Sequence, residues 1–153
     1  MNKNRQKWKI AILALLFALL VVFIFSNSLK SSEESNGDSA KIASVLEPLI
    51  EMIFGEGRVS ANYVVRKCAH LAEFALLGFL SMMLVSVTTR YNGKKLLSVG
   101  LFVTLAVAVA DEYIQNFTGR TSSVSDVLID FSGVLIGMTV AFLLCLIKRK
   151  DRK

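Results

Sequence analysis

Four long apolar runs, separated by polar segments, dominate the chain. A helix needs about 20 apolar residues to cross the hydrocarbon core of a bilayer, and each run is close to this length. The runs cover approximately residues 8–26, 64–88, 96–115 and 126–147. The pattern therefore predicts an all-α membrane protein, a four-transmembrane-helix bundle that forms a single domain over residues 1–153. The hydrophobic content of 54% agrees, because it exceeds that of ordinary soluble domains.

The first apolar run follows a basic segment and starts at Trp8, which we expect to anchor the helix at the membrane–water interface. We predict that this run stays in the protein as an uncleaved spanning helix. A secretory signal peptide has the same beginning, and Ser26-Asn27-Ser28 could be its cleavage site, although an Ala-x-Ala pattern is absent. Cleavage would leave the topology of the remaining spans unchanged.

Residues 27–63 form a long polar segment between the first two spans. Its tract 29–39 is rich in Ser, Glu and Asp, and we expect it to be mobile because it has no means of burying itself. Apolar residues then recur at helical spacing over residues 42–54, with Pro48 as a potential bend and Gly55 at the end. This pattern predicts an amphipathic helix that either lies on the membrane surface or packs on the bundle as a lid.

The distribution of basic residues predicts the orientation in the membrane. If both termini and the turn at residues 90–95 are cytoplasmic, two-thirds of the 18 Lys and Arg residues lie inside. The positive-inside rule therefore predicts cytoplasmic termini and an extracellular amphipathic helix. The net charge of +6 does not indicate nucleic-acid binding, because the basic residues flank apolar runs instead of lining a polar face with interleaved aromatics.

This topology places one end of each of the last three spans at the outer surface. Polar side chains are concentrated near these outer ends. Arg66, His70 and Glu73 share one face of the second span, and Asp111 and Gln115 share one face of the third. Ionisable groups are costly inside a membrane, so these side chains should face the bundle interior and find partners there. The expected cluster consists of Arg66, Lys67, His70, Glu73, Asp111, Glu112, Gln115, Arg120, Asp126 and Asp130.

A stripe on the fourth span continues this cluster toward the middle of the membrane. Asp126, Asp130, Gly133 and Gly137 lie within a narrow arc of the helix. Glycines at this spacing let two helices approach closely in lipid, either within one chain or between chains of a homo-oligomer. The sequence leaves both arrangements open.

The cluster contains more acidic than basic residues, so we expect it to hold a proton, a cation or a cationic ligand group. It could also be an ion-pair network without chemistry. His70 and Glu73 with other carboxylates could bind a metal. Alternatively, Glu73 could act as a general base through His70, with Arg66 or Arg120 holding a phosphate.

Other candidate reactive groups have structural explanations. Ser123 lies three residues before Asp126, the spacing of a helix N-terminal cap, so we do not predict a catalytic serine. Cys68 and Cys145 fall at opposite ends of their spans, so we expect two packing residues and neither a disulfide nor a shared metal site.

Motifs of mixed polar and apolar residues occur in every predicted span. The first span ends with Phe25-Ser26-Asn27-Ser28. The others contain Arg66-Lys67-x-x-His70-x-x-Glu73-Phe74-Ala75-x-Leu77-Gly78, Asp111-Glu112-x-x-Gln115-x-Phe117-x-Gly119-Arg120 and Asp126-Val127-x-Ile129-Asp130-x-x-Gly133-x-x-x-Gly137. Across essentially the whole chain, these motifs resemble the VanZ-like family of small bacterial membrane proteins. Three positions differ from the usual family pattern, where Ser28 replaces Gln, Thr118 replaces Pro and Asp130 replaces Asn.

The resemblance implies a location in the bacterial cytoplasmic membrane and a role in resistance to teicoplanin more than to vancomycin. It implies no particular reaction. Because teicoplanin carries an acyl chain that vancomycin lacks, we expect action at the outer membrane–water interface.

We therefore expect an outward-facing site that binds or modifies an envelope lipid or a lipid-linked glycan and lowers sensitivity to lipoglycopeptides. The expected catalytic residues, which would handle protons or a cation, are His70, Glu73, Asp111 and Glu112. The expected substrate-binding residues are Arg66, Lys67, Gln115, Arg120, Asp126 and Asp130. The alternatives are a lipid head-group transferase or hydrolase and a proton-coupled lipid or solute carrier. The sequence identifies no cofactor.

Overall fold

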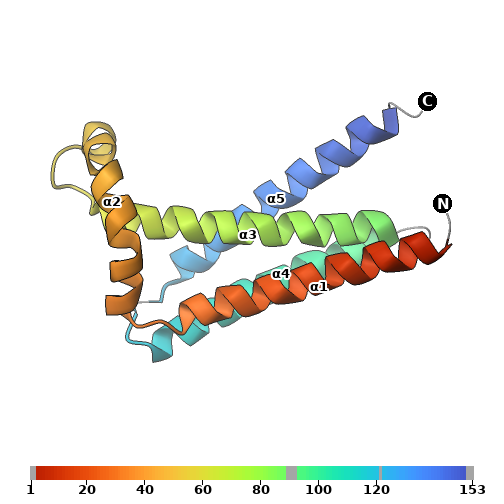
Figure 1. Cartoon of the computed structure of the whole chain (residues 1–153), viewed down its shortest axis with the longest axis horizontal. Helices are drawn as coiled ribbons and strands as arrows, with labels where there is room; N and C mark the ends of the chain where they lie inside the picture. Colours follow the sequence, from red (N-terminus) through yellow and green to blue (C-terminus); the bar gives the residue numbers. More distant parts are fainter. Residues whose placement is uncertain (1–2, 89–92, 121, 151–153) are drawn as a thin grey trace.

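The computed structural model describes residues 3–88, 93–120 and 122–150, and within them it contains five helices and no strands (Figure 1). Four helices are long and apolar enough to cross a membrane: α1 (Lys3–Ser28), α3 (Ala61–Thr88), α4 (Gly93–Phe117) and α5 (Val124–Lys150). The helix α2 (Ser32–Phe54) lies between the first two. The prediction of four helices long and apolar enough to span a membrane is confirmed, and most of them extend a few residues beyond the predicted bounds.

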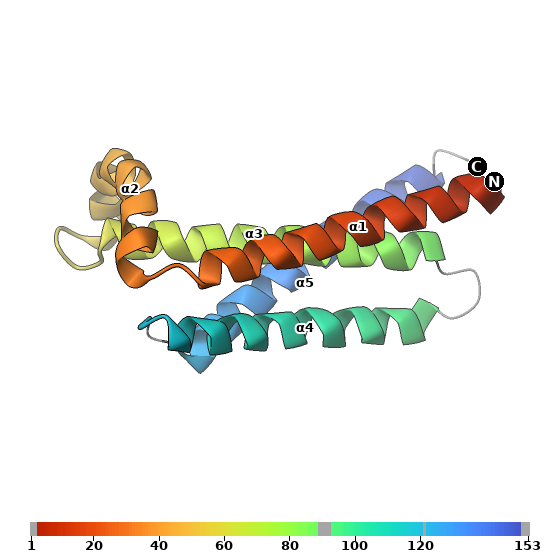
Figure 2. The ribbon, with the colours of Figure 1, turned by 60° about the horizontal axis from the view of Figure 1, so that its bottom comes forward.

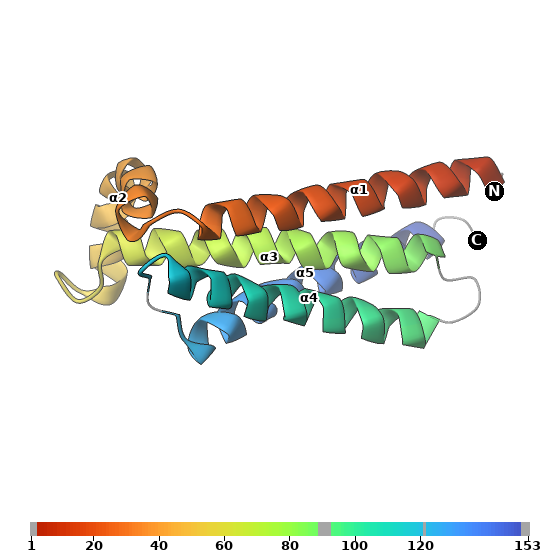
Figure 3. The same cartoon turned by 90° about the horizontal axis from the view of Figure 1, so that it is seen from below.

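The spanning helices form an elongated bundle in which α1, α3 and α4 run side by side (Figure 3). In Figure 1, α5 crosses α3 at an angle. The start of α1 and the end of α5 lie at one end of the bundle, and α2 lies at the other (Figure 2). The turn predicted around Asn92 and the last C-terminal basic residues lie outside the described residues.

The α3–α5 interface is the most extensive helix contact, and glycines make it possible. A Cβ added at Gly137 would lie 1.7 Å from the carbonyl oxygen of Ala75, and one added at Gly78 would lie 2.1 Å from that of Val134. The two backbones are therefore in direct contact, which only glycine permits. The glycine stripe predicted on the fourth span thus serves a contact within the chain, and Gly78 of α3 is part of the same interface.

A small core lies where α1, α3, α4 and α5 meet. Ile24, Phe74, Leu77 and Val134 are fully buried in it. The apolar side chains on the outer faces of these helices are exposed, as expected for surfaces that contact lipid. The core therefore occupies only the inside of the bundle, beside the polar cluster.

The helix α2 begins earlier than the sequence analysis predicted. Ser31 caps it, because its hydroxyl accepts a hydrogen bond from the Glu34 amide while the Glu34 carboxylate accepts one from the Ser31 amide. The acidic side chains of the first turn also favour helix formation there. The tract expected to be mobile is therefore helical from Ser32 onward. As predicted, the helix passes through Pro48 and ends at Gly55, which has a φ of 91°.

One part of the apolar face of α2 packs on the bundle. Ala43 and Ile50 are buried against Ala61, Val64 and Val65 at the start of α3. The remaining apolar side chains of α2 stay exposed: Ile42, Val45, Leu46, Leu49, Met52, Ile53 and Phe54. The helix thus packs as a lid, and it leaves an apolar surface beside the bundle.

Candidate functional site

The predicted site residues meet at the end of the bundle that carries α2. Helix α3 contributes Arg66, Lys67, His70 and Glu73, α4 contributes Asp111, Glu112 and Gln115, α5 contributes Asp126 and Asp130, and the α4–α5 connection contributes Arg120. Five of these side chains are buried: Asp111, Glu112, Gln115, Arg120 and Asp130. The structure therefore brings residues far apart in sequence into one partly dry site.

His70 is held between a guanidinium group and two carboxylates. Arg120 Nη2 lies 3.3 Å from His70 Nε2. Because a guanidinium can only donate, Nε2 must be the acceptor. The other ring nitrogen, Nδ1, lies 3.7 Å from an Asp111 oxygen and 3.9 Å from an Asp130 oxygen, both beyond hydrogen-bonding distance. The imidazole is thus anchored on one side and faces negative charge on the other.

Asp111 is the most completely bound carboxylate of the site. It has no exposed surface, and each of its oxygens accepts a hydrogen bond. The donors are the Ser28 hydroxyl and the Gln115 amide, the latter at 2.7 Å. This confirms that Asp111 and Gln115 face the same way. Asp130 differs, because its Oδ2 has no hydrogen-bond partner among the described residues although only 2% of the residue is exposed.

The first span contributes two site residues that the sequence analysis did not select. Asn27 donates a hydrogen bond to Glu73 Oε1 at 3.1 Å, and Ser28 binds Asp111. The other Glu73 oxygen has no partner among the described residues. The signal for these residues was the Phe25-Ser26-Asn27-Ser28 motif at the end of the span. Its side chains became site residues only when α1 packed against α3 and α4.

Three of the predicted residues stabilise helix ends. Lys67 forms an ion pair with Asp126 in the first turn of α5. Glu112 accepts a hydrogen bond from the backbone amide of Ser123 at 3.2 Å. The Ser123 hydroxyl in turn accepts from the Asp126 amide, so its predicted role as a cap is confirmed. These contacts fasten the start of α5 to α3 and α4.

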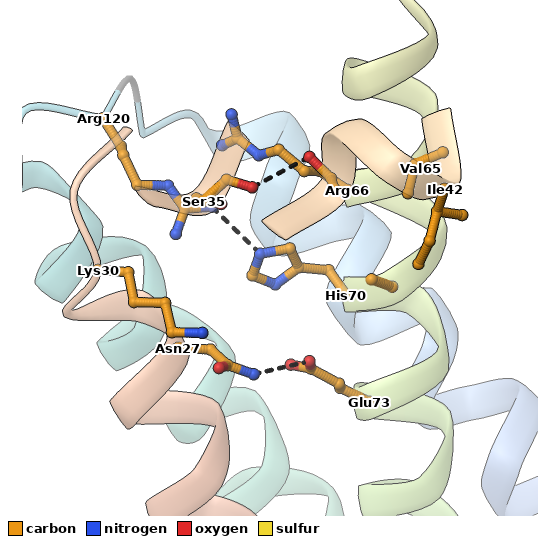
Figure 4. Close-up of a pocket in the computed structure, with 11 residues that line it drawn as sticks. Asn27, Lys30, Ser35, Ile42, Val65, Arg66, His70, Glu73 and Arg120 are labelled. Carbon is orange, nitrogen blue, oxygen red and sulfur yellow. Dashed lines mark hydrogen bonds between the residues drawn. The ribbon is translucent and has the colours of Figure 1, made fainter. Parts of the chain in front are cut away.

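A cavity of about 240 Å³ opens beside His70, between α1, α2, α3 and Arg120 (Figure 4). We call it the polar cavity. Its lining residues are Asn27, Lys30, Ser35, Ser39, Ile42, Val65, Arg66, Ala69, His70, Glu73 and Arg120. The lining thus contains three cationic side chains and one carboxylate, whereas Asp111 and Asp130 lie behind His70 and outside the lining. The excess acidic charge expected from the sequence is therefore separated from a cationic cavity.

The two arginines of the cavity have unused hydrogen-bonding capacity. Arg66 Nη1 donates to Asn36 at 3.2 Å, and Arg120 donates to His70, but the buried Nε atoms of both arginines have no partner among the described residues. Burial lowers the pKa of Arg120, and the charge of Arg66 lowers it further. An anion bound in the cavity would offset both effects.

A metal-binding geometry is present nearby. Among the described residues, one ligand atom each from His70, Asp111 and Asp130 lies within 4.8 Å of the other two, and Glu73 is not part of the group. A histidine and two carboxylates suit several divalent cations. However, Nε2 of His70 accepts from Arg120, so Nδ1 carries the proton of the neutral ring. Binding a metal at Nδ1 would therefore require Arg120 to move away from the imidazole.

Comparison with known proteins adds one finding. A family model described as VanZ/LLP1 matches residues 10–146, a range that includes every predicted site residue. No curated protein and no solved structure matches the chain.

Proposed function

The chain belongs to the VanZ/LLP1 family, and we propose that it functions as a multi-pass membrane protein. It acts at the outer face of the bacterial cytoplasmic membrane, where it binds or modifies an envelope lipid or a lipid-linked glycan. This action lowers sensitivity to lipoglycopeptide antibiotics such as teicoplanin. Both termini are cytoplasmic in this proposal, and α2 is extracellular.

The observation that carries the proposal is the polar cavity. It lies at the end of the bundle, under a helix with an exposed apolar face, where a lipid head group can enter from the membrane surface. Arg66 and Arg120 line the cavity, and their guanidinium groups can bind an anionic group there. The basic residues in the first turns of α1 lie at the other end of the bundle, and together with the basic residues of the 90–95 turn and the C-terminus in the sequence they support an outward-facing cavity through the positive-inside rule.

The acidic residues behind the cavity help to orient the imidazole of His70. Asp111 and Asp130 face His70 Nδ1, and Arg120 holds Nε2, so the imidazole is positioned next to the bound head group. Glu73 lines the cavity, and one of its oxygens has no partner among the described residues, so a small movement of the side chain would let it accept a proton or a hydrogen bond from the ligand. Lys67 and Asp126 support the site by holding α5 in place.

The test uses a sensitive Gram-positive host that expresses wild type or Glu73→Gln, with the membrane level of each protein measured. Wild type should protect against teicoplanin more than against vancomycin, and Glu73→Gln should lose the protection. Glu47→Gln is the matched control, because Glu47 is exposed on α2 and lines no described cavity. Full protection by Glu73→Gln at equal membrane level would contradict the proposed role of the cavity.

The free Glu73 oxygen also favours a second candidate function, a lipid head-group transferase or hydrolase in which Glu73 is a general base. A lipid extract that differs by a defined mass between hosts with wild type and Glu73→Gln would support this enzyme. Identical lipid profiles with a loss of protection in the mutant would support binding alone.

A further inference from the structure

A second hollow lies directly beside the polar cavity. It is an apolar groove of about 460 Å³ between α2 and α3, which we call the α2–α3 groove. Leu46, Leu49, Ile53 and Phe54 line it from α2, and Val64 and Cys68 line it from α3. Cys68 is an exposed free thiol there, so the expectation that it packs inside the bundle is wrong.

The groove and the polar cavity are adjacent and share part of their walls. Ile42, Val65 and Ala69 line both of them. The shared lining places a cationic hollow, with Arg66 and Arg120, next to an apolar one. One amphiphilic molecule can therefore occupy both, with an anionic group in the cavity and a hydrocarbon chain in the groove.

The cavity is large enough for a compact anionic group. Its volume of about 240 Å³ accommodates a phosphate with its glycerol linkage. The cationic lining favours a head group of negative charge. Charge and volume together thus suit the phosphate of an anionic phospholipid.

We propose that the polar cavity and the α2–α3 groove form one binding site for an anionic phospholipid of the bilayer. Its phosphate contacts Arg66 and Arg120, and one acyl chain lies along the groove while the other stays in the membrane. This inference rests on the proposed function and names the class of lipid that the site takes. Ala69 is a small exposed residue that lines both hollows, so its side chain occupies little of the space where they meet.

The test is photo-crosslinking of the full chain in phosphatidylcholine nanodiscs. The probe is phosphatidic acid with a photoreactive diazirine on one acyl chain, and a diacylglycerol with the same chain is the uncharged comparison. Mass spectrometry should locate the phosphatidic acid adducts on the groove residues, with much less labelling by diacylglycerol. Unlabelled phosphatidic acid should compete. Labelling spread evenly over the lipid-facing helices, or equal labelling by both probes, would overturn the inference.

Two variants separate the two ends of the site. Ala69→Phe should block the junction and reduce groove labelling about tenfold, whereas Ala14→Phe, a matched change on the exposed face of α1, should leave it unchanged. Arg66→Gln should reduce the preference for phosphatidic acid over diacylglycerol. Circular dichroism and size-exclusion chromatography establish that each variant is folded. Unchanged labelling of folded Ala69→Phe would contradict the site, as would capture of a second copy of the chain in the groove instead of lipid.

Failure of this inference can be told from failure of the proposed function. Specific groove labelling without any protection against teicoplanin by wild type would support the phospholipid site and contradict the antibiotic role. Teicoplanin protection that survives in folded Ala69→Phe, with groove labelling lost, would contradict the phospholipid as the relevant ligand while the proposed function stands.

Discussion

The hydroxyl of Ser28, the last residue of α1, donates a hydrogen bond to the carboxylate of Asp111 on α4, 83 residues further along the chain. Both residues are fully buried. This bond closes the site from the side of α1 and occupies one of the two Asp111 oxygens. The first span is therefore a part of the site as well as a membrane anchor.

Replacing Ser28 by Ala should lower the free energy of unfolding by about 1–2 kcal/mol, because one oxygen of a buried carboxylate loses its donor. Unfolding of the purified protein in detergent, followed by circular dichroism, measures this change. Ser26→Ala is the control, since Ser26 is exposed and, within the part of the chain that the structure describes, donates to the Val22 carbonyl of its own helix alone. An equal loss in both variants would show that the Ser28–Asp111 bond contributes nothing specific.

His70 should be a neutral imidazole with its proton on Nδ1, because Nε2 accepts from Arg120. His70 is the only histidine, so nitrogen-15-labelled histidine reports on this ring alone in an NMR spectrum. Arg120→Met should remove the donor and shift the ring toward protonation at Nε2. Arg58→Met, a change at an exposed arginine, should leave the spectrum unchanged. Protonation at Nε2 in the wild type would contradict the Arg120–His70 contact.

Gly137→Ala should destabilise the fold by about 3 kcal/mol or more, because the new Cβ would collide with the Ala75 carbonyl and force α3 and α5 apart. Gly37→Ala provides the contrast. Among the described residues, nothing beyond the adjoining helix backbone lies within 4 Å of a Cβ at Gly37, so this change within α2 should stabilise by about 0.5–1 kcal/mol. Thermal unfolding of both variants in the same detergent measures the difference. Equal tolerance of both substitutions would contradict the close α3–α5 contact.

The ion pair between Lys67 and Asp126 should show a coupling energy of about 1 kcal/mol in a double-mutant cycle of Lys67→Met and Asp126→Asn. The side chains are only 23% and 13% exposed, so the coupling should persist at high salt. Unfolding of the four proteins at two salt concentrations measures it. Strictly additive effects would mean that the pair does not hold α5 to α3.

The sequence by itself determined the features that depend on local pattern. Apolar runs long enough to cross a membrane predicted the four spans, since backbone groups in lipid must be satisfied within a helix. Helical periodicity predicted that Asp111 and Gln115 lie on the same face of their helix. The spacing of Ser123 and Asp126 predicted the N-terminal cap of α5. The early start of α2 was also readable, because Ser31 and Glu34 have the spacing of a capping box. The polarity of the tract obscured this signal.

Only the tertiary structure decided how these elements combine. The glycines of α5 could have joined two chains, and the direct contact of Gly137 with Ala75 assigns them to α3. The packing of α1 made site residues of Asn27 and Ser28. The tertiary structure also separates the cationic cavity from the buried carboxylates Asp111 and Asp130. The sequence showed only the net charge of all these residues together. The physical reason is that local pattern determines which face of a helix is polar, while the fit of side chains between helices determines which faces meet.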